Sequence, residues 1–340
     1  MTKKQALLAE MQKIFREKGG EALNKAKTEI TSIYKTDNNL SKALRYFSNA
    51  TLRDPLPVFP ALVAISCEAV GGNAEIAVPF GEAVFLIACS ADLHDDIIDQ
   101  SFSKGPKKTV LGRFGSVETI LAGDALLARG LTLLNEASAS IPKEQGELIN
   151  RLTANSIFEL CIAESLETRL RALGLKVKPK DYSEVIRLKA GFPELTLRVG
   201  AILGKGNLES VEALGEFGRT FGIISTVADE FSDLLNPVEL TNRLQHECPP
   251  FPLIYALQNH KANTRLVPLL KSDLSNEKAH EAIVNVVLEL PKVKSFVKTL
   301  KATAKSEVEK IEPKIKRKSR EELETVLLAP LEFLGTACSI

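Results

Sequence analysis

The sequence predicts an all-α protein, a single large helical bundle over residues 1–340. Apolar residues recur at spacings of three and four along most of the chain, which is the period of an amphipathic helix. Between them stand Ala, Leu, Glu and Lys, which are all strong helix formers. Alternating β-branched segments bounded by hairpin turns are nearly absent. Because the breaks that contain Pro and Gly are short, the helices are expected to be antiparallel neighbours in one bundle rather than domains on a linker.

The clearest helical periods predict four long elements. In chain order they are the segments 116–134, 149–174, 183–203 and 208–234. A further segment, 83–91, is apolar almost all round, and a helix of that kind belongs at the centre of a bundle. Pairs such as Gly71-Gly72 and Pro249-Pro250 fall between helical segments and are expected to punctuate them.

Composition excludes several classes of protein. The chain has 44 Lys and Arg against 43 Asp and Glu, a net charge of +1, whereas nucleic-acid-binding proteins normally carry a basic excess. No transmembrane segment is expected, because no apolar run approaches the roughly 20 residues that span a bilayer. The five cysteines have no CxxC spacing, so neither a disulfide scaffold nor a zinc site is expected. With a charged N-terminus that lacks a secretory core, the protein is expected to be cytoplasmic.

The apolar segment 83–91 runs directly into a cluster of aspartates. Its members stand at i, i+3, i+4 and i+7: Asp92, Asp95, Asp96 and Asp99. On a helix these carboxylates share one stripe, and like charges at this spacing destabilise the helix. A cluster at the end of a buried helix therefore requires counter-charge. Taken alone, the stretch is also compatible with a solvated acidic helix face.

A second acidic cluster makes the solvated face the weaker interpretation. Asp229 and Asp233 are four residues apart, with Glu230 between them, at the end of the apolar stretch 221–228. Two such helix ends can face each other across a bundle. Magnesium binds to one or two carboxylates together with waters and phosphate oxygens. The two clusters therefore predict a Mg²⁺-bridged diphosphate whose hydrocarbon tail points between the helices.

Both clusters resemble the aspartate-rich motifs of the trans-isoprenyl diphosphate synthases, the polyprenyl synthetase family. Residues 95–99, DDIID, resemble the first motif, and residues 229–233, DEFSD, resemble the second. Other stretches resemble the family in matching order between about residues 40 and 260: Gly71-Gly72, the segment from Gly115 to Asp124, Arg187-Leu-Lys189 and the segment 249–257. The resemblance implies a bundle of the isoprenoid synthase type around a central apolar cavity.

The resemblance also implies a prenyltransferase that condenses isopentenyl diphosphate with an allylic prenyl diphosphate. In this family two or three Mg²⁺ ions bridge the aspartates and the allylic diphosphate, and apolar walls keep water from the carbocation. Carried over by motif, the metal ligands are Asp95, Asp96, Asp99, Asp229 and Asp233. Lys189 matches the lysine that contacts the allylic diphosphate, and Arg243 takes the spacing of another phosphate-binding lysine. The expected catalytic residues are Asp95, Asp96, Asp99, Lys189 and Asp229.

The expected site for isopentenyl diphosphate departs from the family pattern. The family has Gly-Gly-Lys-Arg-x-Arg-Pro before the first motif, whereas residues 49–55 contain Arg53 as their one basic residue. Part of the cationic site is expected to be rebuilt from four substrate-binding residues after the first motif: Lys104, Lys107, Lys108 and Arg113. Two alternatives stay open, a prenyl-diphosphate-binding subunit of a heteromeric synthase and a terpene synthase that uses a single allylic diphosphate. The family implies a homodimer, with a heteromer as the other option.

Residues just before the first motif bear on product length. Short-chain members of the family place bulky aromatics there, but this chain has Ser90 and Ala91. Small residues leave the substrate pocket open, so a product of C20 or longer is expected. On a later helix, Glu164 and Glu167 stand where the family has a glutamine and an aspartate. Either they orient metal-bound water, or they pair with arginines of the same helix, Arg169 and Arg171.

Overall fold

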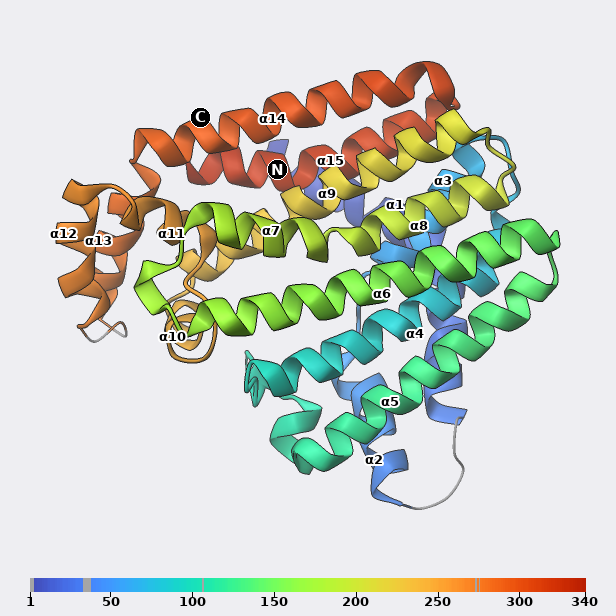
Figure 1. Cartoon of the computed structure of the whole chain (residues 1–340), viewed down its shortest axis with the longest axis horizontal. Coiled ribbons are helices and arrows are strands. Elements are labelled where there is room, and N and C mark those ends of the chain that lie inside the picture. Colours follow the sequence, from blue (N-terminus) through green and yellow to red (C-terminus); the bar gives the residue numbers. More distant parts are fainter. Residues whose placement is uncertain (1–2, 33–37, 106, 273, 275) are drawn as a thin grey trace.

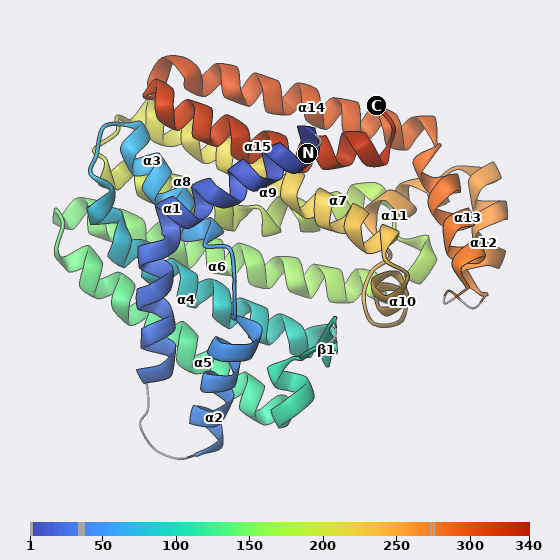
Figure 2. The same ribbon diagram turned by 180° about the vertical axis from the view of Figure 1, so that it is seen from behind.

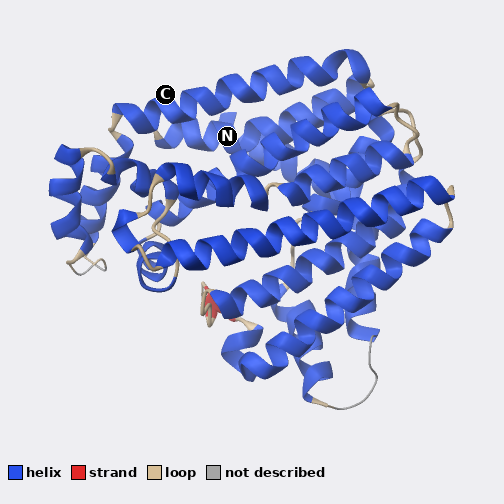
Figure 3. Ribbon diagram, in the orientation of Figure 1, coloured by secondary structure: helices blue, strands red, loops and turns tan. Residues whose placement is uncertain are grey.

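The computed structural model describes residues 3–32, 38–105, 107–272, 274 and 276–340, and helices make up almost all of this part of the chain (Figures 1 and 3). The helices are α1 (Lys3–Ser32), α2 (Asn39–Tyr46), α3 (Val58–Ala69), α4 (Ala74–Ile98), α5 (Val110–Ala139), α6 (Lys143–Arg171), α7 (Pro179–Lys189), α8 (Gly191–Leu203), α9 (Leu208–Leu235), α10 (Pro237–His246), α11 (Phe251–Leu257), α12 (His260–Leu270), α13 (Glu277–Leu288), α14 (Pro291–Ile311) and α15 (Arg317–Ala337). Short helical turns are η1 (Phe47–Thr51), η2 (Gly174–Lys176) and η3 (Glu312–Lys314), and strands β1 (Ser103–Lys104) and β2 (Lys107–Lys108) form an antiparallel hairpin. The all-α prediction is confirmed.

Helix α4 lies at the centre of the bundle, as its apolar sequence predicts. It packs against α5, α3 and α1, with α6 in front of it in Figure 1 and with α1 crossing in front of it in the reverse view of Figure 2. Leu86 and Leu93 on α4 are completely buried. An 18-residue stretch of α4 is apolar enough to cross a membrane by length and composition alone, but 61% of that stretch is buried inside the protein. That burial is typical of the core helix of a bundle.

Three of the four long predicted helices are confirmed, and the prediction of one continuous helix over 183–203 is wrong. Helices α5, α6 and α9 cover nearly all of the first, second and fourth segments. The segment 183–203 is two helices, α7 and α8, which meet at Ala190. Pro193 is the local cause, because it has no N–H to donate to the carbonyl of Lys189 four residues earlier.

The first acidic cluster lies at the C-terminal end of α4, where a residue in the left-handed conformation ends the helix. Gln100 has a φ of 54°. Its N–H donates to the carbonyl of Ile97 at 3.3 Å, and the N–H of Ser101 donates to the carbonyl of Asp96 at 2.8 Å. These two bonds form a Schellman motif. The chain then reverses through the β1–β2 hairpin, which returns Lys104 to the aspartates that precede it.

The second acidic cluster lies at the C-terminal end of α9, where an Asn-Pro pair turns the chain. The side chain of Asn236 accepts hydrogen bonds from the N–H groups of Val238 at 3.0 Å and Glu239 at 3.4 Å. Pro237 takes the first position of α10, where no N–H donor is needed. Helix α10 packs back against α9, and it thereby carries Arg243 to the acidic cluster.

Candidate active site

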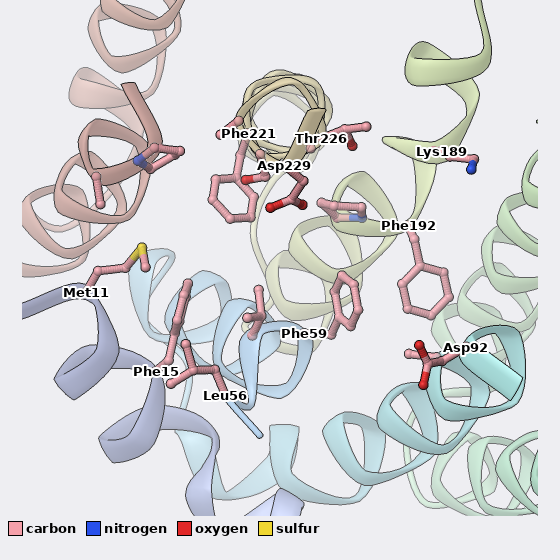
Figure 4. Close-up of a pocket in the computed structure, with 18 of the residues that line it drawn as sticks. Met11, Phe15, Leu56, Phe59, Asp92, Lys189, Phe192, Phe221, Thr226 and Asp229 are labelled. Carbon is pink, nitrogen blue, oxygen red and sulfur yellow. The ribbon is translucent and has the colours of Figure 1, made fainter. Parts of the chain in front are cut away.

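A cavity of about 800 Å³, which we call cavity A, lies between α1, α3, α4, α9 and α15. Asp92 and Asp229 face it from different walls (Figure 4). Most of the remaining surface is apolar and includes Met11, Phe15, Leu56, Phe59, Phe192 and Phe221. Cavity A therefore has one carboxylate from each acidic helix end on the walls of a largely apolar space.

A second cavity of about 630 Å³, which we call cavity B, lies between α4, α5 and α6. The residues that it shares with cavity A are Ala91, Asp92, Leu160, Lys189 and Phe192. Asp95 and Ser90 line cavity B, and Ser90 is almost completely buried. Both residues expected to govern product length therefore lie on cavity walls, and the two cavities meet at a common junction.

Two basic residues from other parts of the chain pair with the first acidic cluster. The Nζ of Lys104 lies 2.7 Å from Asp92 Oδ1 and 2.9 Å from Asp96 Oδ1. The Nη2 of Arg171 lies 2.7 Å from Asp99 Oδ1. Burial nevertheless raises the pKa of Asp96 to about 6 and that of Asp99 to about 8. The counter-charge that the sequence predicts is therefore present, although it does not fully offset the cost of burying these carboxylates.

Asp95 carries a buried carboxylate oxygen that faces no basic partner at ion-pair distance among the described residues. Its Oδ1 is buried and has no hydrogen-bond partner within the described part of the chain, and burial raises the pKa of this carboxyl. A buried, unpartnered carboxylate oxygen beside a cavity suits a hard cation that prefers oxygen ligands. Among the described residues, no three His, Cys, Asp or Glu side chains gather into a preformed metal site.

Lys189 stands at the junction of the two cavities, between two glutamates of α6. Its Nζ lies 3.0 Å from Glu164 Oε1 and 2.7 Å from Glu167 Oε2. Burial opposes the charged ammonium, but these carboxylates outweigh it and raise the pKa of Lys189. Because an ammonium has three N–H donors, one remains for a ligand. Of the two alternatives for these glutamates, pairing with Arg169 and Arg171 is not what the structure has, since both glutamates pair with Lys189.

Arg243 holds the second acidic cluster from inside the protein. Its Nη2 donates to both carboxylate oxygens of Glu230 at 2.9 Å, its Nη1 donates to Asp233 Oδ2 at 3.1 Å, and its Nε donates to the carbonyl of Cys248 at 3.0 Å. Arg243 is only 8% exposed and is not among the residues that line either cavity. The expectation that it contacts phosphate is therefore corrected. It is a buried counter-ion, because the turn at Asn236 folds α10 onto α9.

Asp229 has a different environment from its neighbours. Its carboxylate faces cavity A, on the same helix as Thr226 and Ser232. Burial raises the pKa of Asp229 to about 6, with smaller contributions from Asp233 and Glu230, and no basic residue in the described part of the chain offsets them. A cation in cavity A would supply that missing charge.

The other basic residues expected to bind substrate lie on or beside the β1–β2 hairpin, and all are exposed. Lys107 Nζ donates to the carbonyl of Ala50 at 3.4 Å, and the carbonyl of Lys108 accepts a hydrogen bond from the hydroxyl of Tyr46 at 2.7 Å. The guanidinium of Arg113 lies 4.4 Å from the centre of the Tyr46 ring. The hairpin therefore lies against the part of the chain where the family's basic stretch is reduced.

Tyr182 is a residue of this region that the sequence analysis missed. It is 2% exposed, and its hydroxyl lies 2.9 Å from Glu167 Oε1 and 2.8 Å from Glu230 Oε1. The available signal was its position on α7, two helical turns before Lys189 and on the same face. Asp92 was recognised as part of the acidic stripe but not as a site residue, although it stands at the junction of the cavities.

Comparisons with known proteins agree with this geometry. The profile of the polyprenyl synthetase family matches residues 57–287. The geranylgeranyl diphosphate synthase of Methanosarcina mazei is 28% identical over 212 residues, which are 61% of this chain and 62% of that protein. Large subunit 1 of the heterodimeric chloroplastic geranylgeranyl pyrophosphate synthase of Arabidopsis thaliana is 29% identical over 206 residues, 57% of this chain and 54% of that protein. The matches thus span less than two thirds of the length of these curated relatives.

Solved structures share the fold over nearly the whole chain. The geranylgeranyl pyrophosphate synthetase of Pyrococcus horikoshii has a TM-score of 0.81 and 23% identity, with 96% of this chain and 99% of that chain covered. The decaprenyl diphosphate synthase of Rhodobacter capsulatus has a TM-score of 0.73 and 18% identity, with 94% and 98% covered. The isoprenoid synthase type of bundle that the sequence implies is confirmed. The chain belongs to the polyprenyl synthetase family.

Proposed function

We propose that the protein is a cytoplasmic trans-prenyl diphosphate synthase that condenses isopentenyl diphosphate with an allylic prenyl diphosphate. The observation that carries this proposal is the junction of the two cavities. Asp92 and Lys189 line both cavities at this junction, and Asp229 lines cavity A. A diphosphate there would lie within reach of both acidic helix ends, while apolar walls receive the hydrocarbon. The curated relatives named as geranylgeranyl diphosphate synthases support a product of C20 or longer.

Mg²⁺ would be held by Asp95 and Asp96 on α4, by Asp99 at its C-cap, and by Asp229 and Asp233 on α9. The unpartnered Oδ1 of Asp95 and the uncompensated charge of Asp229 are the features that fit a hard cation best. When bound, the metal neutralises charge that develops on the departing diphosphate.

The residues of this chain have separate tasks in the proposed reaction. Lys189 donates its remaining N–H to the allylic diphosphate, whose C–O bond breaks with the electron pair leaving on the diphosphate. The apolar walls of cavity B, with Ser90 and Ala91, take the chain and exclude water from the allylic cation. The double bond of isopentenyl diphosphate then attacks the cation and a C–C bond forms. The departed diphosphate takes the proton whose loss restores a double bond.

Four exposed basic residues would hold the diphosphate of isopentenyl diphosphate: Lys104, Lys107, Lys108 and Arg113. Their support is the position of the hairpin, which lies against residue Ala50 in the reduced basic stretch. A cluster of lysines and an arginine at the rim of an acidic site would attract a diphosphate and balance its charge.

A homodimer is part of the proposal, and an exposed apolar face supports it. On α5 and α6, which pack together, five large apolar side chains are between 44% and 66% exposed: Val117, Ile120, Leu121, Phe158 and Ile162. A patch of this kind marks an interaction surface in soluble proteins. Light scattering on purified protein should give twice the chain mass of 37.1 kDa. A stable monomer would contradict the homodimer and direct the search to a different partner chain.

The proposed activity is tested with purified protein, Mg²⁺ and radiolabelled isopentenyl diphosphate, offered with dimethylallyl, geranyl, farnesyl or geranylgeranyl diphosphate in turn. Labelled prenyl diphosphates of C20 or longer are expected. Release of pyrophosphate from an allylic substrate without incorporation of label would instead indicate an enzyme that uses one substrate, and absence of both reactions would contradict an enzyme that acts alone.

A further inference from the structure

A row of buried polar contacts leads inward from the second acidic helix end. Arg243 bridges Asp233 and Glu230, and its Nη2 also donates to the hydroxyl of Tyr182 at 2.8 Å. The backbone N–H of Phe251 donates to Glu230 Oε2 at 2.8 Å and fixes that carboxylate from the far side. Arg243 and Glu230 are 8% and 4% exposed, so water does not compete for these bonds.

The same row continues to the lysine at the cavity junction. The hydroxyl of Tyr182 lies 2.9 Å from Glu167 Oε1, and Glu167 Oε2 lies 2.7 Å from the Nζ of Lys189. Glu167 is 5% exposed, while Lys189 is the member of the row that reaches both cavities. The polar groups therefore connect Asp233, at one acidic helix end, to the ammonium that faces the other.

Tyr182 is the point at which the two halves of the row meet. A phenol has one proton to donate and lone pairs to accept with. Here the oxygen accepts from Arg243 and lies within hydrogen-bond distance of two carboxylates, those of Glu167 and Glu230. Its ring is buried against Phe251, with 5.9 Å between the ring centres. The hydroxyl is thus fixed in place by packing and can fix the charged groups around it.

We propose that Tyr182 is a positioning residue that sets the separation between Lys189 and the second acidic helix end. Through Glu167 it directs the ammonium of Lys189 into the cavity junction, and through Arg243 it holds Asp233. A diphosphate that bridges the two ends then meets groups already at the required distance, so less binding energy is lost in ordering them. This inference rests on the proposed function, because it takes Lys189 as a ligand of the diphosphate.

The substitution Tyr182→Phe removes the hydroxyl and keeps the buried ring. Mg²⁺-dependent binding of inorganic pyrophosphate, measured by calorimetry, should weaken by roughly tenfold, which is the usual effect of losing a hydrogen bond to a charged group. The KM for an allylic diphosphate should rise by a similar factor, with kcat changed by less than about threefold. The matched control is Tyr255→Phe, since Tyr255 packs against the same Phe251, with ring centres 5.0 Å apart, and lines neither cavity. The control should bind pyrophosphate as the wild type does.

A double-mutant cycle separates positioning from a loss of stability. In a Lys189→Ala background, Tyr182→Phe should cause little further loss of pyrophosphate binding, because the group that it positions is already gone. The inference would be overturned if Tyr182→Phe bound pyrophosphate as tightly as the wild type. It would also be overturned if Tyr182→Phe weakened binding in the Lys189→Ala background by as much as it does in the wild type. If Tyr182→Phe does not fold, Glu167→Gln tests the same step, since the amide still accepts from Tyr182 but no longer attracts Lys189; unchanged binding by that variant would also overturn it.

The wild-type protein distinguishes this inference from the proposed function. Pyrophosphate binding without turnover of any allylic substrate would contradict the proposed function and leave the positioning role open to the same variants. Absence of Mg²⁺-dependent pyrophosphate binding by the wild type would contradict both.

Discussion

The two acidic helix ends carry the same pattern of acids but acquire counter-charge in opposite ways. At the end of α4, Lys104 and Arg171 pair with Asp96 and Asp99, and Lys104 remains 48% exposed. At the end of α9, the cation is Arg243, whose side chain is only 10% exposed. The first end is therefore neutralised from the rim of the site, and the second from the core of the protein.

The turn that follows each helix explains the difference. After α4, a left-handed residue and a two-stranded hairpin return the chain along the surface, so the returning lysine stays at the solvent boundary. After α9, an Asn-Pro turn begins a new helix, and that helix places Arg243 against the interior. The same sequence motif thus specifies both helix ends. The segment that follows each helix determines whether the basic partner lies at the solvent boundary, as Lys104 does, or in the interior, as Arg243 does.

The largest expected effect is the loss of activity when either end loses the carboxylate that faces a cavity. Asp95→Asn and Asp229→Asn should each lower the rate of Mg²⁺-dependent pyrophosphate release by roughly a thousandfold, because each removes a proposed metal ligand. Initial rates with an allylic diphosphate measure this. The control is Asp181→Asn, an exposed aspartate at the start of α7 that lines neither cavity. A rate within tenfold of the wild type for either variant would remove that carboxylate from the metal site.

The second effect separates the two kinds of counter-ion. Arg243→Ala should lower the free energy of unfolding by about 3–5 kcal/mol, because it leaves buried carboxylates without their partner. Lys104→Ala should lower it by a smaller amount, because the Lys104 side chain is 48% exposed and water can take its place beside the half-exposed Asp92, although Asp96 is buried. Urea unfolding followed by circular dichroism measures both. Equal losses would show that the two helix ends are neutralised alike.

The first acidic end should also make stability depend on pH. Burial raises the pKa of Asp96 from 3.8 to about 6 and that of Asp99 to about 8, so the folded state holds more protons than the unfolded chain in this window. Stability is then highest near pH 4 and falls as pH rises through these values. In metal-free buffer the Tm should fall by roughly 5 °C between pH 4 and pH 8, and Mg²⁺ with pyrophosphate should reduce that fall. A Tm that rises between pH 4 and pH 8 would contradict the raised pKa values of Asp96 and Asp99.

Narrowing cavity B is expected to have the smallest effect on the reaction rate but a clear effect on product length. Ser90→Phe should shorten the products, because Ser90 lines cavity B alone. Met11→Phe, which narrows cavity A alone, should leave product length unchanged. Chromatography of the labelled products measures both. Shorter products from Met11→Phe and not from Ser90→Phe would assign the growing chain to cavity A.

Local spacing allowed part of this site to be predicted. The acids at i and i+4 on one helix share a face whatever the rest of the fold does, so the two clusters could be assigned from their spacing, whereas Lys189 was assigned from the resemblance to the family. The partner of Arg243 could not, because Tyr182 is 61 residues away in the sequence and α7 meets α10 only in the folded bundle. The break between α7 and α8 was missed because Pro193 lies within an apolar pattern that continues on both sides of it. Periodicity identifies the helices, but long-range pairing of buried charges depends on their tertiary packing.

The most direct test is whether the two acidic ends bind one diphosphate together. Calorimetric titration with pyrophosphate should show binding by the wild type only when Mg²⁺ is present. Asp95→Asn and Asp229→Asn should each abolish most of that binding, and the double variant should bind no more weakly than the weaker single variant, because both changes damage one site. Binding at wild-type affinity by either single variant, or losses that add as they do for independent sites, would contradict a shared site.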